Sequence, residues 1–175
     1  MNNMNRKDVT IPSPIADKIA WAEECYRTSG NRLLKDSRIA GLLSKVNAAV
    51  AESRSAMMAT DMINVCRRCE MEEGGSCCGV GMERKYDDGL LLMNLLLGVT
   101  LPKERWDERS CFFLGDIGCL LKVRHVICVN YICKKITDRV APEELRALKE
   151  KEGVELDAVF VLQEELRRVL RGGGH

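Results

Sequence analysis

The sequence predicts a mainly α-helical fold, in which helices form a scaffold around a small irregular lobe that is rich in cysteine, binds metal and contains one short β-hairpin. The flanks of the chain carry apolar residues at helical spacing, whereas glycines interrupt the centre. Eight of the nine cysteines lie in that centre. A chain of 175 residues, with 46% hydrophobic and 30% charged residues, has the size and composition of one soluble domain. We therefore expect residues 1–175 to form a single domain.

Residues 1–65 are expected to form the N-terminal helices. The first helix begins after Pro14, and Gly30 is its expected stop. An apolar stripe over residues 33–63 predicts a second, longer helix that runs nearly into Cys66. The cysteine-rich lobe is therefore expected to start at the end of a helix.

Residues 66–136 are expected to form the lobe, with one apolar helix inserted in it. The inserted helix is predicted over residues 87–98, where the chain is strongly apolar. Two short apolar runs, 111–114 and 119–121, flank a Gly-Asp-Ile-Gly turn and predict the β-hairpin. The stretch 126–136 fits either a strand or a helix.

Residues 137–171 are expected to form a C-terminal helical hairpin. Pro142, followed by two glutamates, is a typical helix start, and the helix that it begins is expected to end near Gly153. A second helix is predicted from about residue 155 to 171. Two helices with so short a connection would pack antiparallel.

Charge and composition exclude several classes of partner. A net charge of +1 provides no field that would attract nucleic acid or an anionic membrane, and 5% aromatic residues leave few surfaces on which bases could stack. The longest apolar run, 90–101, is short of the roughly 20 residues of a transmembrane helix. The first residues, MNNMNRKDVTIPSP, lack the apolar region of a secretory signal. We expect a cytoplasmic protein that binds neither nucleic acid nor membrane, and a protein partner is left open.

The cysteines of the window 66–133 are the candidate metal ligands. They are Cys66, Cys69, Cys77, Cys78, Cys111, Cys119, Cys128 and Cys133. In a reducing compartment such a pattern is more typical of a metal site or of catalysis than of disulfides. Thiolates are soft ligands that suit zinc and iron–sulfur clusters. Cys25 stands apart on a helical segment and is expected in the helical core.

The spacing of the cysteines favours an iron–sulfur cluster, or a site with several metal ions, over a single zinc ion. Zinc sites commonly use two CxxC pairs, and this chain has one, Cys66 with Cys69. Adjacent residues such as Cys77 and Cys78 present both sulfurs to one ion only with backbone strain. They reach two irons of a cluster, or two separate centres, more easily. Zinc is the alternative metal.

The order of these cysteines resembles that of the YkgJ family, a cysteine-cluster family described as a zinc- or iron-chelating domain. The matching segments are 66–69 (CRRC), 77–78 (CC), 111–114 (CFFL), 118–120 (GCL) and 124–133 (RHVICVNYIC). The resemblance covers residues 66–133 and implies a metal-chelating module held by the same eight thiols. This chain departs from the family in the seven residues between Cys69 and Cys77, where the family commonly has two, and in His125, where the family commonly has proline.

A metal-binding protein without catalytic activity is the function that the sequence favours. The alternatives are a cluster-dependent redox enzyme and a metal-free dithiol oxidoreductase. The sequence contains no glycine-rich phosphate loop, nucleophile elbow or HExxH helix. His125 is expected to be a surface residue, or a hydrogen-bond donor to a metal ligand, rather than a metal ligand itself. Arg67 and Arg124 are candidates for offsetting thiolate charge. We therefore expect closed, all-cysteine coordination without hydrolytic activity.

Overall fold

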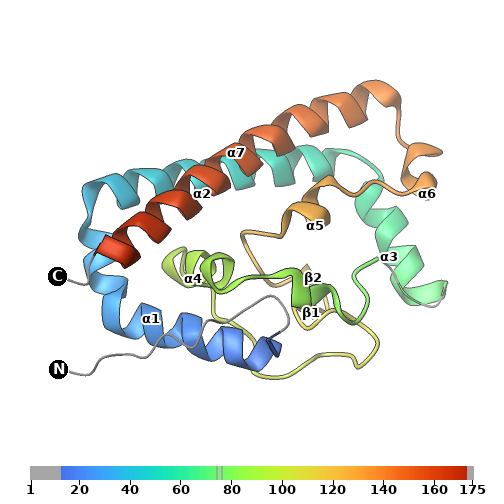
Figure 1. Ribbon diagram of the computed structural model, residues 1–175. Coiled ribbons are helices and arrows are strands. Elements are labelled where there is room, and N and C mark those ends of the chain that lie inside the picture. Colours follow the sequence, from blue (N-terminus) through green and yellow to red (C-terminus); the bar gives the residue numbers. More distant parts are fainter. Residues whose placement is uncertain (1–12, 74, 76, 173–175) are drawn as a thin grey trace.

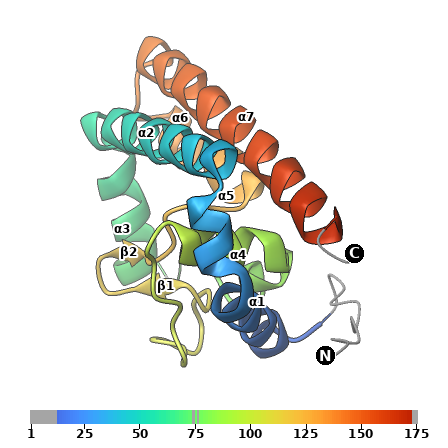
Figure 2. The same cartoon turned by 90° about the vertical axis from the view of Figure 1, so that its left-hand side faces the viewer.

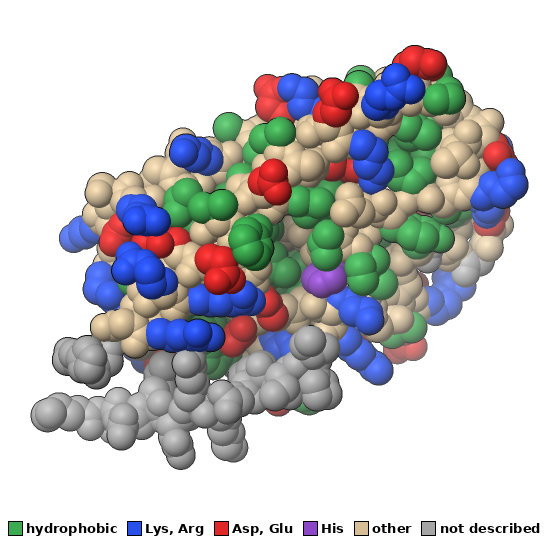
Figure 3. All heavy atoms as spheres, turned by 45° about the horizontal axis from the view of Figure 1, so that its top comes forward, with side chains coloured by type: hydrophobic (Ala, Val, Ile, Leu, Met, Phe, Trp, Pro, Cys, Tyr) green, Lys and Arg blue, Asp and Glu red, His purple; other side chains and the backbone are tan. Residues whose placement is uncertain are grey.

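The computed structural model describes residues 13–73, 75 and 77–172, and its fold is mainly helical, as predicted. Two long helices, α2 (Ser37–Ala59) and α7 (Pro142–Gly172), lie side by side and run antiparallel (Figure 1). Helix α1 (Ile15–Lys35) lies beneath this pair, and α4 (Asp88–Leu96) packs against α1 and α7 (Figure 2). On the face shown in Figure 3, acidic, basic and hydrophobic side chains are interspersed.

The main hydrophobic core lies between these four helices. Residues with less than 1% exposure come from every one of them, among them Leu33, Val46, Leu91 and Leu162. Cys25 is 4% exposed and belongs to this core, as the sequence predicted. Within the described residues, no helix is both long and apolar enough to cross a membrane.

The predicted boundaries of the N-terminal helices were wrong at two points. Helix α1 continues through Gly30, where a Cβ atom would lie 2.9 Å from Cδ2 of Tyr26, so the glycine makes room for that ring. The break comes instead at Asp36, whose Oδ1 accepts hydrogen bonds from the backbone amides of Arg38 (2.9 Å) and Ile39 (3.0 Å) and so caps α2.

The apolar stripe over residues 33–63 is not one helix. It spans the end of α1, all of α2 and the start of a separate helix, α3 (Met62–Glu72). Thr60 ends α2, and its hydroxyl donates to the carbonyl of Met57 (2.8 Å). As a result Cys66 lies inside a helix and not at the end of one.

The elements predicted within residues 66–136 are present. Asp87 caps α4 through a hydrogen bond from the amide of Leu90 to its Oδ1 (2.8 Å), and the helix ends before Gly98 at φ 81°. A single 3₁₀ turn, η1 (Met82–Lys85), precedes it. The hairpin pairs β1 (Leu114–Gly115) with β2 (Gly118–Cys119). The stretch 126–136, whose sequence fitted either a strand or a helix, forms two short helices, α5 (Val126–Asn130) and α6 (Lys134–Thr137).

The predicted C-terminal helical hairpin was wrong, because α7 is one continuous helix of 31 residues. Its buried residues keep the alternating spacing of four and three across Gly153: Leu148, Glu152, Glu155, Val159, Leu162 and Leu166. Two of these inward positions are glutamates. The apolar pattern therefore looked interrupted at the point where the helix continues.

Candidate metal centre

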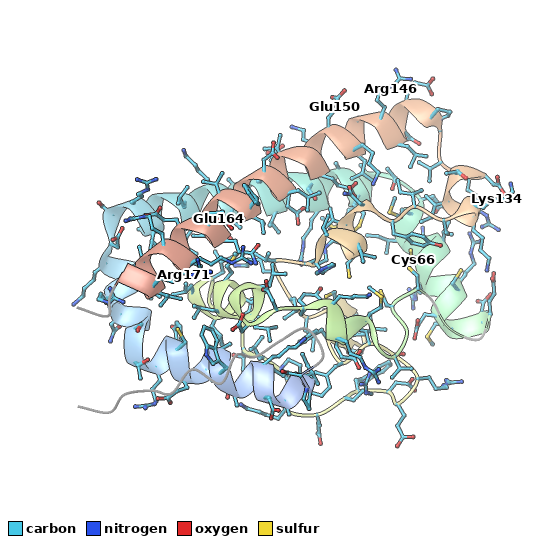
Figure 4. The ribbon with its side chains drawn as sticks, in the orientation of Figure 1. Cys66, Lys134, Arg146, Glu150, Glu164 and Arg171 are labelled. Atoms are coloured by element: carbon cyan, nitrogen blue, oxygen red, sulfur yellow. The ribbon has the colours of Figure 1, made fainter. Side chains whose placement is uncertain are left out.

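The eight candidate ligands come from six neighbouring parts of the chain. Cys66 and Cys69 lie on α3, three positions apart and so on one helix face. The others are Cys77 and Cys78 in the turn that follows, Cys111 before the hairpin, Cys119 in β2, Cys128 in α5 and Cys133 at the start of α6. Figure 4 places Cys66 and Lys134 at the same end of the molecule.

Backbone hydrogen bonds join the turn that carries Cys78 to the segment that carries Cys111. The amide of Cys111 donates to the carbonyl of Cys78 (2.6 Å), and Gly79 forms an isolated antiparallel bridge with Ser110. The hydroxyl of Ser110 donates to Glu70 of α3 (2.7 Å). These contacts bring cysteines that are far apart in the sequence into one region.

Four of the eight cysteines lie against the main hydrophobic core, and we call them the core quartet. The core quartet consists of Cys78, Cys111, Cys119 and Cys128. Burial raises the pKa of the Cys111 thiol to about 11, and the nearby charges of Glu83, Cys119 and Cys128 add to this shift. The pKa of the Cys78 thiol is also raised. Its hydrogen bond with Cys77 and its burial contribute most, and the charges of Cys119 and Cys128 add to them. The four thiols are thus close enough for their charges to interact.

The other four cysteines lie at the edge of the molecule, and we call them the peripheral quartet. The peripheral quartet consists of Cys66, Cys69, Cys77 and Cys133. Burial raises the pKa of Cys66 to about 11, and the charges of Cys77, Cys133 and Cys69 raise it further. Cys66 and Cys133 also pack against a second, smaller hydrophobic cluster that includes Val65 and Ile136.

Cys77 connects the two quartets, because it interacts with cysteines of both. Cys77 is exposed, and its charge acts on Cys66 of the peripheral quartet and on Cys78 and Cys128 of the core quartet. Cys78 is half-buried, and the charges of Cys119 and Cys128 act on it. The hydrogen bond with the Cys78 thiol stabilises the Cys77 thiolate and lowers its pKa to about 6.

His125 and Tyr86 hold the helix that carries Cys128. Nδ1 of His125 accepts a hydrogen bond from the amide of Ile127 (3.2 Å) and so caps α5. The Tyr86 side chain is 1% exposed; its hydroxyl accepts from the amide of His125 (3.1 Å) and donates to the Cys128 sulfur (3.8 Å). His125 therefore positions a candidate ligand through the backbone.

The sequence analysis missed Asn94, which fixes the segment after Cys119. Its side-chain amide donates to the carbonyls of Leu90 (2.9 Å) and Val123 (3.0 Å). Its Oδ1 accepts from the amides of Lys122 (2.8 Å) and Val123 (3.0 Å). A signal was present, since Asn94 is a single polar residue within the apolar run 90–101.

The two arginines that were candidates for offsetting thiolate charge differ in position. Arg124 is half-buried, and its charge favours the thiolates of Cys119 and Cys128. Arg67 is exposed on α3. Like Arg124, Arg54 of α2 favours the Cys119 thiolate. Nothing in the local sequence around the cysteines pointed to Arg54.

The part of the chain that the structure describes includes all nine cysteines, and no disulfide joins them. Among those same residues, no three His, Cys, Asp or Glu side chains form one compact group with metal-site geometry. Thiolate sulfur is a donor that suits zinc and iron, so the residue types, though not their arrangement, agree with these metals.

Comparisons with family models, with curated proteins and with solved structures found no match to this chain.

Proposed function

We propose that this protein binds metal through its eight clustered cysteines, with one tetrathiolate centre in the core quartet and one in the peripheral quartet. The observation that supports this most directly is that the charges of Cys69, Cys77 and Cys133 act on Cys66, whereas those of Cys119 and Cys128 act on both Cys78 and Cys111. Four thiolates are the complete ligand set of a structural zinc ion or of an iron–sulfur cluster. The resemblance to the YkgJ family, described as zinc- or iron-chelating, agrees with this function.

Burial opposes ionisation of the quartet thiols, so a metal ion has to displace their protons when it binds. A thiol in an apolar environment resists ionisation, and the raised pKa values of Cys66 and Cys111 reflect this resistance. A bound metal ion supplies the positive charge that makes the thiolate form favourable. Binding would therefore draw the sulfurs of each quartet together and release protons.

A closed centre with four protein thiolates leaves no position for substrate, so we propose a structural or electron-transfer role and no hydrolysis. Thiols that hold metal need a reducing compartment, which agrees with a cytoplasmic location. Metal analysis and an absorption spectrum of anaerobically purified protein test the proposal. Broad visible absorption with bound iron identifies clusters, and a colourless protein with bound zinc identifies zinc centres.

Single cysteine variants test the division into quartets. Cys119→Ser should lower the metal content of the core quartet and Cys69→Ser that of the peripheral quartet, each leaving the other centre loaded. Cys25→Ser is the matched control and should keep the full metal content, because Cys25 lies in the helical core. Full loading in both quartet variants would contradict the proposal.

A metal-free dithiol oxidoreductase is the second candidate, and the exposed Cys77 supports it. Its thiolate is stabilised by the neighbouring Cys78 thiol, which is the property of an attacking cysteine. A purified protein that contains no metal, and that reduces a model disulfide only when Cys77 is intact, would favour this alternative.

A further inference from the structure

A groove of about 550 Å³ runs between α2 and α7. Its lining is mostly apolar, and its most exposed apolar side chains are Val154 and Val161 of α7, at 60% and 48% exposure. Helices α1 and α4 lie beneath the α2–α7 pair (Figures 1 and 2), and no residue of theirs lines the groove. The groove is therefore an apolar surface that is open to a partner.

Two ion pairs define how α2 and α7 lie against each other. Arg38 of α2 pairs with Glu165 of α7 (3.2 Å), and Glu52 of α2 pairs with Lys151 of α7 (3.1 Å). The two ion pairs are fourteen residues apart on each helix. The antiparallel helices therefore stay in register over two heptads.

Between these ion pairs the groove is built in layers, each formed by one residue of α2 and one of α7. The layers follow at spacings of three and four residues along both helices. They are Leu42 with Val161, Lys45 with Ala158, and Ala49 with Val154. This spacing is typical of a four-helix bundle, in which one antiparallel pair of helices packs on another. The α2–α7 pair thus presents one half of a bundle.

The charged residues of the groove make its surface complementary to itself. Lys45 of α2 lies at the level of Asp157 of α7, which precedes Ala158 of the same layer. Both are exposed, and neither forms an ion pair within the part of the chain that the structure describes. At the level of the Glu52–Lys151 pair, α2 carries the acid and α7 the base. Each level therefore has one charge of each sign, which favours a single register of a partner.

A second copy of this chain matches the groove in one orientation. With a two-fold axis parallel to the helices, α2 of each copy lies over α7 of the other at the same level. Lys45 then meets Asp157 of the second copy, and apolar layers meet apolar layers. With the axis across the helices, Leu42 would instead cover the Glu52–Lys151 pair and strip it of water, which is unfavourable.

The α2–α7 face is large enough for a stable dimer. Helix α2 has 23 residues. It is therefore about 35 Å long, and two neighbouring helices are about 20 Å wide, which gives a face of roughly 700 Å². Each partner of a standard stable interface buries a similar area, about 800 Å².

We infer that this protein forms a symmetric dimer in which the α2–α7 faces of two copies make a four-helix bundle, with the two-fold axis parallel to the helices. Val154 and Val161 fill the apolar layers of this bundle, and Lys45 of each copy pairs with Asp157 of the other. No cysteine lines the groove, so the inference goes beyond the proposed function and does not depend on it.

Sedimentation velocity of the full-length protein, under reducing conditions that exclude disulfide-linked chains, tests this inference. The wild type should change from one chain to two as its concentration rises from about 1 µM to about 500 µM, by mass action. Val154→Glu places a carboxylate in an apolar layer and should weaken the dimer by about 30-fold or more. Phe160→Glu is the matched control and should leave the dimer unchanged, since Phe160 is 62% exposed on the same helix and lies outside the groove.

Charge reversal tests the orientation of the two copies. Lys45→Glu and Asp157→Lys should each weaken the dimer about tenfold, because like charges then face each other across the interface. The double variant should regain the wild-type dissociation constant. Circular dichroism checks that every variant keeps its helices, as expected for exposed positions.

A wild type that remains a single chain at about 500 µM would overturn the inference. An equal response to Val154→Glu and Phe160→Glu would overturn it too, because another surface would then hold the dimer. A double variant that stays as weak as the single ones would rule out the axis parallel to the helices. Metal analysis is a separate measurement, so the failure of the dimer and the failure of the proposed function are distinguishable.

Discussion

At the scale of single residues, Cys77 has the most distinctive chemistry of the nine cysteines. It is exposed, and the adjacent Cys78 thiol lowers its pKa to about 6. The thiolate is the reactive form, so in the metal-free reduced protein Cys77 should be alkylated first at neutral pH. Its reaction with iodoacetamide should reach half its maximal rate near pH 6, as measured by mass spectrometry of labelled peptides across pH.

Two variants control this prediction. Cys78→Ala removes the thiol that donates to Cys77, so the half-maximal pH should rise toward the ordinary value of a cysteine, roughly 8.5. Cys25→Ser should leave the labelling of Cys77 unchanged, because Cys25 lies in the core. Faster labelling of any other cysteine at pH 7 in the metal-free wild type would show that Cys77 is not activated.

Asn94 is the residue whose loss should most disturb the segment after Cys119. In Asn94→Leu the amides of Lys122 and Val123 lose their acceptor. We expect the free energy of unfolding to fall by about 2–4 kcal/mol in urea denaturation, because each buried donor left without a partner costs ~1–3 kcal/mol. Asn47→Leu, at an exposed position of α2, should change the free energy of unfolding by no more than about 0.5 kcal/mol. A similar small change in Asn94→Leu would contradict the role assigned to Asn94.

At the scale of secondary-structure elements, Gly153 tests whether α7 is continuous. It lies inside the helix, and a Cβ atom there would meet nothing within 4 Å. Gly153→Ala should therefore stabilise the protein by about 0.5–1 kcal/mol, the usual gain in a helix interior. Gly98→Ala is the contrasting variant and should destabilise it, because Gly98 has φ 81°. Loss of stability in Gly153→Ala would favour the two-helix hairpin.

The elements that could be predicted from the sequence are those whose signals are local. The hairpin followed from a Gly-Asp-Ile-Gly turn between apolar runs, and α4 followed from an apolar run that ends at Gly98. The errors occur where tertiary contacts override local signals. Gly30 continues a helix because it makes room for the Tyr26 ring, and the buried Glu152 and Glu155 hid the apolar pattern of α7.

At the scale of the whole molecule, the grouping of the cysteines depends on contacts that no local pattern encodes. The sequence named eight thiols as candidate ligands. The packing of Cys66 and Cys133 against one hydrophobic cluster, and of the core quartet against another, depends on the tertiary structure. Arg54 of α2 donates a hydrogen bond to the carbonyl of Leu121, two residues after Cys119 and far from α2 in the chain. Long-range contacts of this kind depend on how the scaffold helices pack.

The packing of α4 determines what should remain folded when metal is removed. The sequence placed this helix within the lobe, yet its side chains Leu91, Leu92 and Met93 are fully buried in the main core. Each such side chain contributes about 1.5–3 kcal/mol through burial. Of the cysteine segments on either side of α4, residues 111–123 contribute the fully buried Phe113, Leu121 and Val123 to the main core, whereas α3 and residues 126–133 contribute no buried residue to it.

Complete removal of metal should therefore unfold α3 and residues 126–133, while the main core persists. Structural zinc contributes roughly 10–16 kcal/mol of apparent binding free energy in small peptides, and such binding is coupled to folding. We expect hydrogen exchange to accelerate over residues 66–73 and 126–133 after chelation. Helix α4 and residues 111–123 should stay protected together with α1, α2 and α7. Protection should return when zinc is added back under reducing conditions. Unchanged exchange in these segments of verified metal-free protein would show that the lobe does not depend on metal. Loss of protection in α4 would show that the lobe and the core unfold as one unit.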